Sequence, residues 1–191
     1  NDPDRIEVGT FMIAAAMLPG SSLRLIGCNA EHLGDFPNLL RQTGTKVDVE
    51  GEVISVQAPD ILKPVSITTD IYPGFPTDLQ AQWATMLTQA HGDSTVTDTV
   101  YFDRFSYVPE LSRLGAQMKL TKNTVHIQGP KVLEGASVMS TDLRASVSLV
   151  LAGMAAKNTS EILRIYHLDR GYESLEDKLN AVGAKLSRAQ E

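Results

Sequence analysis

The sequence has few of the features that mark several large classes of protein. Its single cysteine, Cys28, excludes an internal disulfide and favours a reducing compartment. We interpret Cys28 as a buried thiol at a strand end. The longest apolar stretch, residues 145–156, is shorter than the ~20 residues that a membrane span needs, so it predicts a buried helix. Residues 1–10 are polar and acidic, and we expect no signal peptide and a cytoplasmic location.

Positive charge and metal-ligand spacings are also scarce. The 17 lysines and arginines are outnumbered by 23 acidic residues, and the formal net charge is −6. This balance argues against non-specific nucleic-acid binding, which requires a basic face. The four histidines show no metal-ligand spacing, so no metal site is predicted. A few local arginines would still suffice to bind a small anion.

A repeated unit is the main feature that the sequence does contain. Gly44, Gly115 and Gly183 recur at intervals of about 70 residues, each after a leucine-bearing helical stretch. A glycine in that place predicts a left-handed helix C-cap. Alternating apolar residues then predict strand pairs, with turns at EGE (residues 50–52) and KNT (residues 122–124).

Each unit also has an upstream helix and a short strand. The helices are predicted at residues 10–18, 78–87 and 142–156, and the strands at residues 22–27, 94–101 and 160–167. The first and third of these helices are apolar almost all round, which is typical of buried helices. We therefore predict one α/β domain over residues 1–191. Its three helix–strand–helix–strand-pair repeats would span roughly residues 4–58, 65–129 and 132–188, with helices inside and sheets outside.

The stretch YPGFPTDLQAQWATML, residues 72–87, leaves two interpretations open for Asp78. Thr77 and Gln80 fit a capping box, which would place Asp78 in the first helical turn as a structural anion. A catalytic role is the alternative. The third repeat has Thr141 and Asp142 at the corresponding place while the first repeat has no acid there, and the stiff PGFP entry would fix the side chain.

Three arginines have the same uneven distribution over the repeats. Arg104 and Arg170 lie in DR dipeptides of the strand-to-helix loops of the second and third repeats, and Arg144 lies one turn into a helix. They are either surface residues paired with nearby acids or ligands of a small polyanion, because guanidinium forks bind phosphate and carboxylate with two bonds.

Three strings together, FPTDLQAQ, TDLRASVSLVLAG and IYHLDRGYESLEDKL, resemble the C-terminal part of the UDP-N-acetylglucosamine 1-carboxyvinyltransferases, which are enolpyruvyl transferases. The resemblance covers nearly the whole chain. It implies one lobe of an inside-out α/β barrel made of two three-repeat lobes. It also implies transfer of the enolpyruvyl group of phosphoenolpyruvate to the 3′-hydroxyl of UDP-N-acetylglucosamine, the first step of peptidoglycan synthesis, without a metal or organic cofactor.

The resemblance also assigns roles to residues of this chain. It implies that Asp78 contacts the sugar hydroxyl as the candidate general base, and that Asp142 is a second acid near the reacting centre. The arginines facing phosphoenolpyruvate and phosphate would be Arg104, Arg144 and Arg170, and the sugar-nucleotide side would be lined by Thr77, Val100 and Tyr101.

Other parts of the family pattern are missing from this sequence. The family's reactive cysteine belongs to the other lobe, and Cys28 does not occupy its motif. The second lobe and a short N-terminal segment are expected outside this chain, which begins at Asn1 rather than at a methionine. We therefore expect a fragment that carries half a site and is inactive alone.

Three alternatives compete with this interpretation, the first of them within the same enzyme class. One is a lobe of another enolpyruvyl transferase, of the shikimate phosphate type. A second is a non-catalytic repeat domain that binds phosphosugars. A third, a ring-shaped clamp on nucleic acid, is disfavoured because its inner helices would have to be basic, and here they are apolar.

Overall fold

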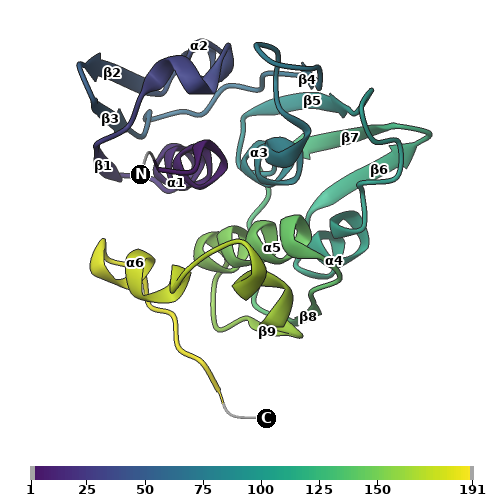
Figure 1. The fold of residues 1–191 in the computed structure, drawn as a ribbon. Helices are drawn as coiled ribbons and strands as arrows, with labels where there is room; N and C mark the ends of the chain where they lie inside the picture. Colours follow the sequence, from purple (N-terminus) through teal and green to yellow (C-terminus); the bar gives the residue numbers. More distant parts are fainter. Residues whose placement is uncertain (1–2, 190–191) are drawn as a thin grey trace.

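The three apolar helices form the centre of the molecule. The computed structural model describes residues 3–189. Helices α1 (Arg5–Met17), α3 (Gln80–Leu87) and α5 (Leu143–Ala155) pack in sequence against one another, with the strands on the outside (Figure 1). All of α3 and most of α1 and α5 are buried. The predicted arrangement of helices inside and sheets outside is therefore confirmed.

The first repeat ends in a three-stranded antiparallel sheet. After α1, the first repeat consists of β1 (Ser22–Ile26), the 3-10 helix η1 (Ala30–Leu33), α2 (Phe36–Gln42), β2 (Lys46–Glu50) and β3 (Val53–Gln57). The strand order is β1-β3-β2. Ile54 and Val56 are buried, whereas Val49 and Lys46 lie toward solvent. One face of the sheet thus covers the helices, as the alternating pattern predicts.

The second repeat follows the same plan with one added strand. Its elements are β4 (Ile67–Thr68), η2 (Thr77–Leu79), α3, β5 (Gly92–Thr97), α4 (Tyr107–Arg113), β6 (Gln117–Thr121) and β7 (Thr124–Gly129). The strand order is β4-β5-β7-β6, and the short strand β4 runs parallel to β5. Sequence reasoning did not predict β4, because two residues are too few to show a period of two.

The third repeat departs from the predicted plan. It consists of β8 (Ser137–Met139), α5, β9 (Glu161–Leu163), η3 (Ile165–Arg170) and α6 (Leu175–Ala181), and β8 pairs with β9 in parallel. The strand predicted to reach residue 167 stops at Leu163, because Arg164 adopts a left-handed conformation, φ 59° and ψ 44°, and the chain turns into η3. The strand pair predicted after Gly183 is not formed within residues 184–189.

The three repeat glycines behave as predicted. Gly44, Gly115 and Gly183 have φ angles of 93°, 101° and 108°. Each donates its backbone N–H to a carbonyl three residues earlier, at 3.0–3.1 Å. Each glycine therefore ends a helix in the left-handed region, where a residue with a Cβ atom is disfavoured.

Across residues 3–189, no helix is both long enough and apolar enough to cross a membrane.

Substitution of Gly34 by alanine is expected to reduce the free energy of unfolding by roughly 2–4 kcal/mol. Gly34 has φ 57° and ψ −130°, and a Cβ atom there would lie 2.3 Å from the carbonyl oxygen of Pro73. Gly51 is the matched control, because its φ is 60° but a Cβ atom there would have no neighbour within 4 Å. Gly51→Ala should cost only about 1 kcal/mol. Equal costs in urea unfolding would contradict the steric argument.

Candidate functional site

Asp78 lies in the turn η2, immediately before α3. The predicted capping box is wrong, because the residue at the N-cap of η2 is Pro76 and no side-chain cap forms. Instead, the hydroxyl of Thr77 donates to Oδ2 of Asp98 at 2.6 Å, and the N–H of Gln80 bonds to the carbonyl of Thr77. A buried carboxylate is a strong acceptor, so it takes the hydroxyl that a helix cap would have used.

The segment before Asp78 is held by aromatic packing. Phe75 is 2% exposed, and its ring centroid lies 5.1 Å from that of Trp83 and 5.9 Å from that of Phe36. The carbonyl of Phe75 also accepts a hydrogen bond from the N–H of Asp70, at 2.9 Å. The stiff entry that the sequence predicts is therefore anchored in the core, and it fixes where the η2 turn begins.

Asp78 forms ion pairs with two of the three predicted arginines. Its Oδ1 lies 3.0 Å from Nη1 of Arg104 and 2.6 Å from Nε of Arg144, and Nη2 of Arg144 contacts the same oxygen. Within residues 3–189, all the side-chain bonds recorded for Asp78 end on Oδ1. The three side chains are partly exposed, so the cluster is open to a ligand.

Val100 and Tyr101 lie on the loop that leaves β5, and Tyr101 contacts this cluster. The guanidinium of Arg104 stacks on the ring of Tyr101, 3.4 Å from its centroid. Both loop residues remain partly exposed, at 39% and 46%. Their side chains can therefore meet a ligand, while the stacked ring orients Arg104.

Asp142 caps α5 and does not contact Asp78. Its Oδ1 accepts the N–H groups of Arg144 and Ala145, each at 2.9 Å, and its Oδ2 accepts the hydroxyl of Ser106 at 2.7 Å. Asp142 thus has a structural role at the start of a helix, which is the role that the sequence left open for Asp78. As the cap of α5, Asp142 also fixes the turn from which Arg144 extends.

Four of the predicted residues surround one cavity of about 310 Å³. Thr77, Arg104, Asp142 and Arg144 line it, together with Gln80, Asp103, Ser106 and Tyr107. The walls come from η2, the loop before α4 and the first turn of α5, so the second and third repeats build it jointly. Tertiary packing brings these residues together from positions up to 67 residues apart.

Arg170 does not line this cavity. It is exposed at the end of η3, and no ion pair of Arg170 occurs among the described residues. Its neighbour Gly171 packs against α5, since a Cβ atom there would lie 2.5 Å from Cδ2 of Leu143. The segment that carries Arg170 therefore borders the start of α5, but the guanidinium is not part of the Asp78 cluster.

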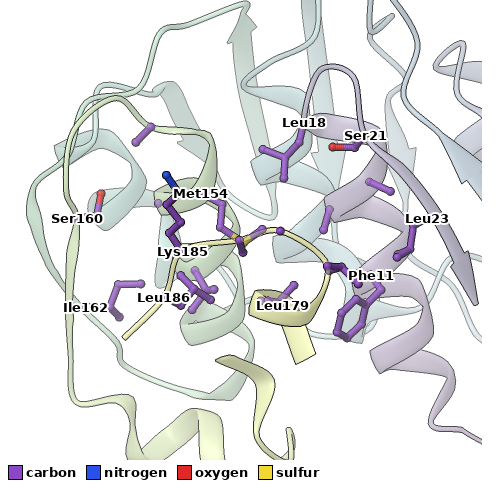
Figure 2. Close-up of a pocket in the computed structure, with 18 of the residues that line it drawn as sticks. Phe11, Leu18, Ser21, Leu23, Met154, Ser160, Ile162, Leu179, Lys185 and Leu186 are labelled. Atoms are coloured by element: carbon purple, nitrogen blue, oxygen red, sulfur yellow. The ribbon is translucent and has the colours of Figure 1, made fainter. Parts of the chain in front are cut away.

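A larger cavity, of about 550 Å³, contains none of the predicted site residues. It lies between the first and third repeats. Figure 2 shows Phe11, Leu18 and Leu23 on one side and Met154, Ile162 and Leu186 on the other. Its lining includes residues 182–186, where the third strand pair was predicted. Lys185 is the one charged residue among its described lining residues, so this cavity lacks the pair of arginines found at the smaller one.

Sequence reasoning missed Asp98 and the buried glutamines of α3. Asp98 is fully buried and accepts bonds from the hydroxyls of Thr69 and Thr77. Gln80 and Gln82 are 1% and 0% exposed. A signal was available, because uncharged polar residues occupy positions of α3 where a helix inside a core would be apolar.

A buried polar chain connects the third repeat to Asp78. Tyr172 hydrogen-bonds to Oγ1 of Thr10 at 2.9 Å, and Thr10 donates its own proton to the carbonyl of Ile6. The amide of Gln82 donates to Thr10 at 3.3 Å and to the backbone carbonyl of Asp78 at 3.0 Å. The segment after Arg170 is thus tied to η2 through the core.

Tyr172 is expected to lose its stabilising effect at alkaline pH. Burial raises its pKa to about 12, although hydrogen bonds with Thr10 and Gln82 oppose the shift. Because the folded pKa lies above the unfolded value near 10, the contribution is complete below pH 10. It falls by about 2–3 kcal/mol as the pH rises toward 12. Urea unfolding of wild type and Tyr172→Phe between pH 9 and 12 measures this, and parallel curves would contradict it.

In residues 3–189, no group of three or more histidine, cysteine, aspartate or glutamate side chains could hold a metal ion.

Sequence comparisons identify close relatives. UDP-N-acetylglucosamine 1-carboxyvinyltransferase of Chlorobaculum parvum is 54% identical over 98% of this chain, and that of Chlorobium phaeovibrioides is 49% identical over 97%. The chain spans 44% and 43% of the length of these two relatives. It therefore corresponds to less than half of each protein.

Solved enolpyruvyl transferase structures and a family model also match this chain. The enolpyruvyl transferase NikO from Streptomyces tendae superposes with a TM-score of 0.88 at 30% identity, covering 96% of this chain and 43% of that one. EPSP synthase from Acinetobacter baumannii, at 16% identity and a TM-score of 0.73 over 96% of this chain and 46% of its own, shares the fold. The model of EPSP synthase (3-phosphoshikimate 1-carboxyvinyltransferase) matches residues 2–179. Since that match takes in both the repeats and the Asp78 cluster, the chain belongs to the EPSP synthase family of enolpyruvyl transferases.

Proposed function

We propose that this chain provides half of an active site that transfers the enolpyruvyl group of phosphoenolpyruvate to the 3′-hydroxyl of UDP-N-acetylglucosamine. The contact of Asp78 with Arg104 and Arg144, two arginines that line one cavity, carries the proposal, because it joins a carboxylate base to an anion clamp. The names and identity of the relatives support the choice of substrates.

In the proposed reaction, Asp78 accepts the proton of the sugar hydroxyl while the hydroxyl oxygen bonds to C2 of phosphoenolpyruvate. A general acid from outside this chain protonates C3, which gives a tetrahedral addition intermediate. Loss of phosphate together with a proton from C3 then forms the enol ether. A positioned base of this kind contributes about 10²–10⁴-fold to the rate.

The two arginines would exchange partners when substrate binds. Without a ligand, both pair with Oδ1 of Asp78. A phosphate or carboxylate in the cavity offers them several oxygen acceptors, so they can turn toward the ligand and release Asp78 for the hydroxyl. Arg170 would join them only if η3 moves toward α5. Thr77, Val100 and Tyr101 would line the side of the sugar nucleotide.

The rest of the site would come from residues outside this chain. The relatives are more than twice as long, and we propose that the second lobe closes over the cavity and supplies the general acid and further cations. We also propose that a segment of the longer protein covers the larger cavity in Figure 2, because the third repeat, as far as residue 189, has no counterpart of the strand pairs β2–β3 and β6–β7. A role in cytoplasmic peptidoglycan synthesis, and through it in cell shape and division, follows from the proposed reaction.

A phosphorylated shikimate-type alcohol is the second candidate acceptor. The family model that matches residues 2–179 is named for an enzyme acting on 3-phosphoshikimate, which favours this alternative. The two candidates differ only in the alcohol, so both use the Asp78 cluster in the same way.

Phosphate release tests the proposal. A protein of the relatives' length that contains this chain, called here the full-length protein, should release phosphate from phosphoenolpyruvate with UDP-N-acetylglucosamine and not with shikimate 3-phosphate. The opposite preference would favour the second candidate. The 191-residue chain alone should release none, and turnover by the pure chain would contradict the half-site proposal.

A further inference from the structure

We propose that Asp98 is a positioning residue that places Asp78 and Arg104 relative to each other. The inference rests on the proposed function for its kinetic consequences. Its structural content is that one buried carboxylate joins the two loops that carry these side chains.

The carboxylate of Asp98 accepts five hydrogen bonds, and the residue is 0% exposed. Its Oδ1 accepts the hydroxyl of Thr69 at 2.7 Å and the N–H groups of Val100 and Tyr101 at 2.9 and 2.8 Å. Its Oδ2 accepts the hydroxyl of Thr77 at 2.6 Å and the amide of Gln80 at 3.2 Å. The carboxylate thus holds three segments of the chain: Oδ1 binds Thr69, after β4, and the loop after β5, and Oδ2 binds the turn into α3.

The bonds to Oδ2 fix the segment that carries Asp78. Thr77 immediately precedes Asp78 in η2, and Gln80 begins α3. Since Thr77 and Gln80 lie on either side of Asp78 in the sequence, anchoring both leaves Asp78 little freedom to shift. Thr77 also accepts a bond from Nη1 of Arg104 at 3.4 Å.

The bonds to Oδ1 fix the segment that leads to Arg104. The N–H groups of Val100 and Tyr101 set the turn after β5, and the ring of Tyr101 supports the guanidinium of Arg104. The amide of Gln80, which bonds to Asp98, also donates to the backbone carbonyl of Arg104 at 3.0 Å. Asp98 is therefore linked to Asp78 through Thr77, and to Arg104 through Tyr101 and Gln80.

The negative charge of Asp98 is needed for this arrangement. Burial would raise its pKa, but hydrogen bonds from Thr77, Tyr101, Thr69 and Gln80 outweigh burial, and the pKa lies below its usual range. The orientation of the Gln80 amide is fixed as well, because its Oε1 accepts the hydroxyl of Tyr107. Nε2 of Gln80 must therefore face an acceptor.

The substitution Asp98→Asn would separate the two effects of the carboxylate, which are to fix η2 through Oδ2 and to fix the loop after β5 through Oδ1. The single carbonyl oxygen of the amide can still accept the bonds that set the turn after β5. Its NH₂ group would face Nε2 of Gln80, donor against donor, and could no longer accept the hydroxyl of Thr77. Asp98→Asn should thus keep the loop of Val100 and Tyr101 but release η2.

Kinetics of the full-length protein test this prediction. Asp98→Asn should lower kcat by about 10²-fold, because a displacement near 1 Å has that effect. Both KM values should stay within about 3-fold of wild type. Asp93→Asn, at an exposed position of the preceding strand β5, is the matched control and should leave kcat unchanged. An unchanged kcat in Asp98→Asn, with only the unfolding temperature lowered, would overturn the proposal.

A double variant tests the route through Thr77. If Asp98 acts through this hydroxyl, Thr77→Val and Asp98→Asn together should reduce kcat no more than Asp98→Asn alone, within about 3-fold. Additive losses of kcat would show that Asp98 does not act through the hydroxyl of Thr77.

A measurement without turnover separates this inference from the proposed function. In full-length protein labelled with ¹⁵N-arginine, the guanidinium protons of Arg104 should exchange with solvent about 10-fold faster in Asp98→Asn than in wild type or Asp93→Asn. If wild type shows no transferase activity, the proposed function fails, and this exchange rate still decides the role of Asp98. Equal exchange rates would refute it.

Discussion

Asp78→Asn in the full-length protein is expected to lower kcat by about 10²–10⁴-fold, because an amide cannot accept the proton of the attacking hydroxyl. The KM for the sugar nucleotide should change little, since asparagine keeps the shape of the side chain. Phosphate release with both substrates measures the loss. If the affinity for sugar nucleotide falls and kcat stays the same, Asp78 binds substrate and is not the base.

The same substitution should strengthen the binding of inorganic phosphate. Asp78 competes with an anionic ligand for Arg104 and Arg144, because both guanidinium groups pair with its Oδ1. Removal of the carboxylate charge leaves these two cations without that partner, so phosphate affinity should rise by about 10-fold. Asp103→Asn is the matched control, since Asp103 lines the cavity beside the two arginines. A similar rise in both variants would reflect net charge alone.

Arg144→Ala is expected to lower kcat/KM for phosphoenolpyruvate by about 10²–10³-fold, the size of effect seen when a donor to developing charge is removed. Arg144 reaches Asp78 with both Nε and Nη2, and this fork would present two donors to a phosphate. Arg144→Lys should recover only part of the loss, because an ammonium keeps the charge but not the fork.

Arg113→Ala supplies the control for this substitution. Arg113 is exposed in the last turn of α4, so its replacement removes the same charge away from the cavity. The kcat/KM of this variant should match wild type. If Arg144→Lys were as active as wild type, charge alone would suffice, and the two-bond recognition of the ligand would be wrong.

The regular parts of the fold were predictable because they depend on local patterns. The burial of α1 and α5 follows from their almost wholly apolar sequences, and the alternation of β2, β3 and β7 follows from side-chain periodicity; both are properties of neighbours in sequence. The C-cap glycines are equally local. The short parallel strands β4 and β8 carry too few residues for a period, and each forms because its partner arrives from a distant segment.

The candidate site was predictable only in part. The uneven occurrence of Asp78, Arg104 and Arg144 among the repeats singled them out, and these three side chains do meet. The capping box failed because Thr77 has a buried carboxylate within reach, which no local pattern of residues 77–80 contains. Arg170 carries the same DR motif as Arg104, but the turn into η3 leaves it in solvent.

The amino-acid sequence by itself determined the three repeats, the buried helices and which acids and arginines deserved testing, because periodicity, glycine caps and charge placement are all written along the chain. Only the tertiary structure decided that Oδ1 of Asp78 meets two guanidinium groups and that Asp98 joins their loops. Those contacts depend on how α3 and α5 pack and on which buried acceptor each donor reaches, and such long-range geometry has no signature in local spacing.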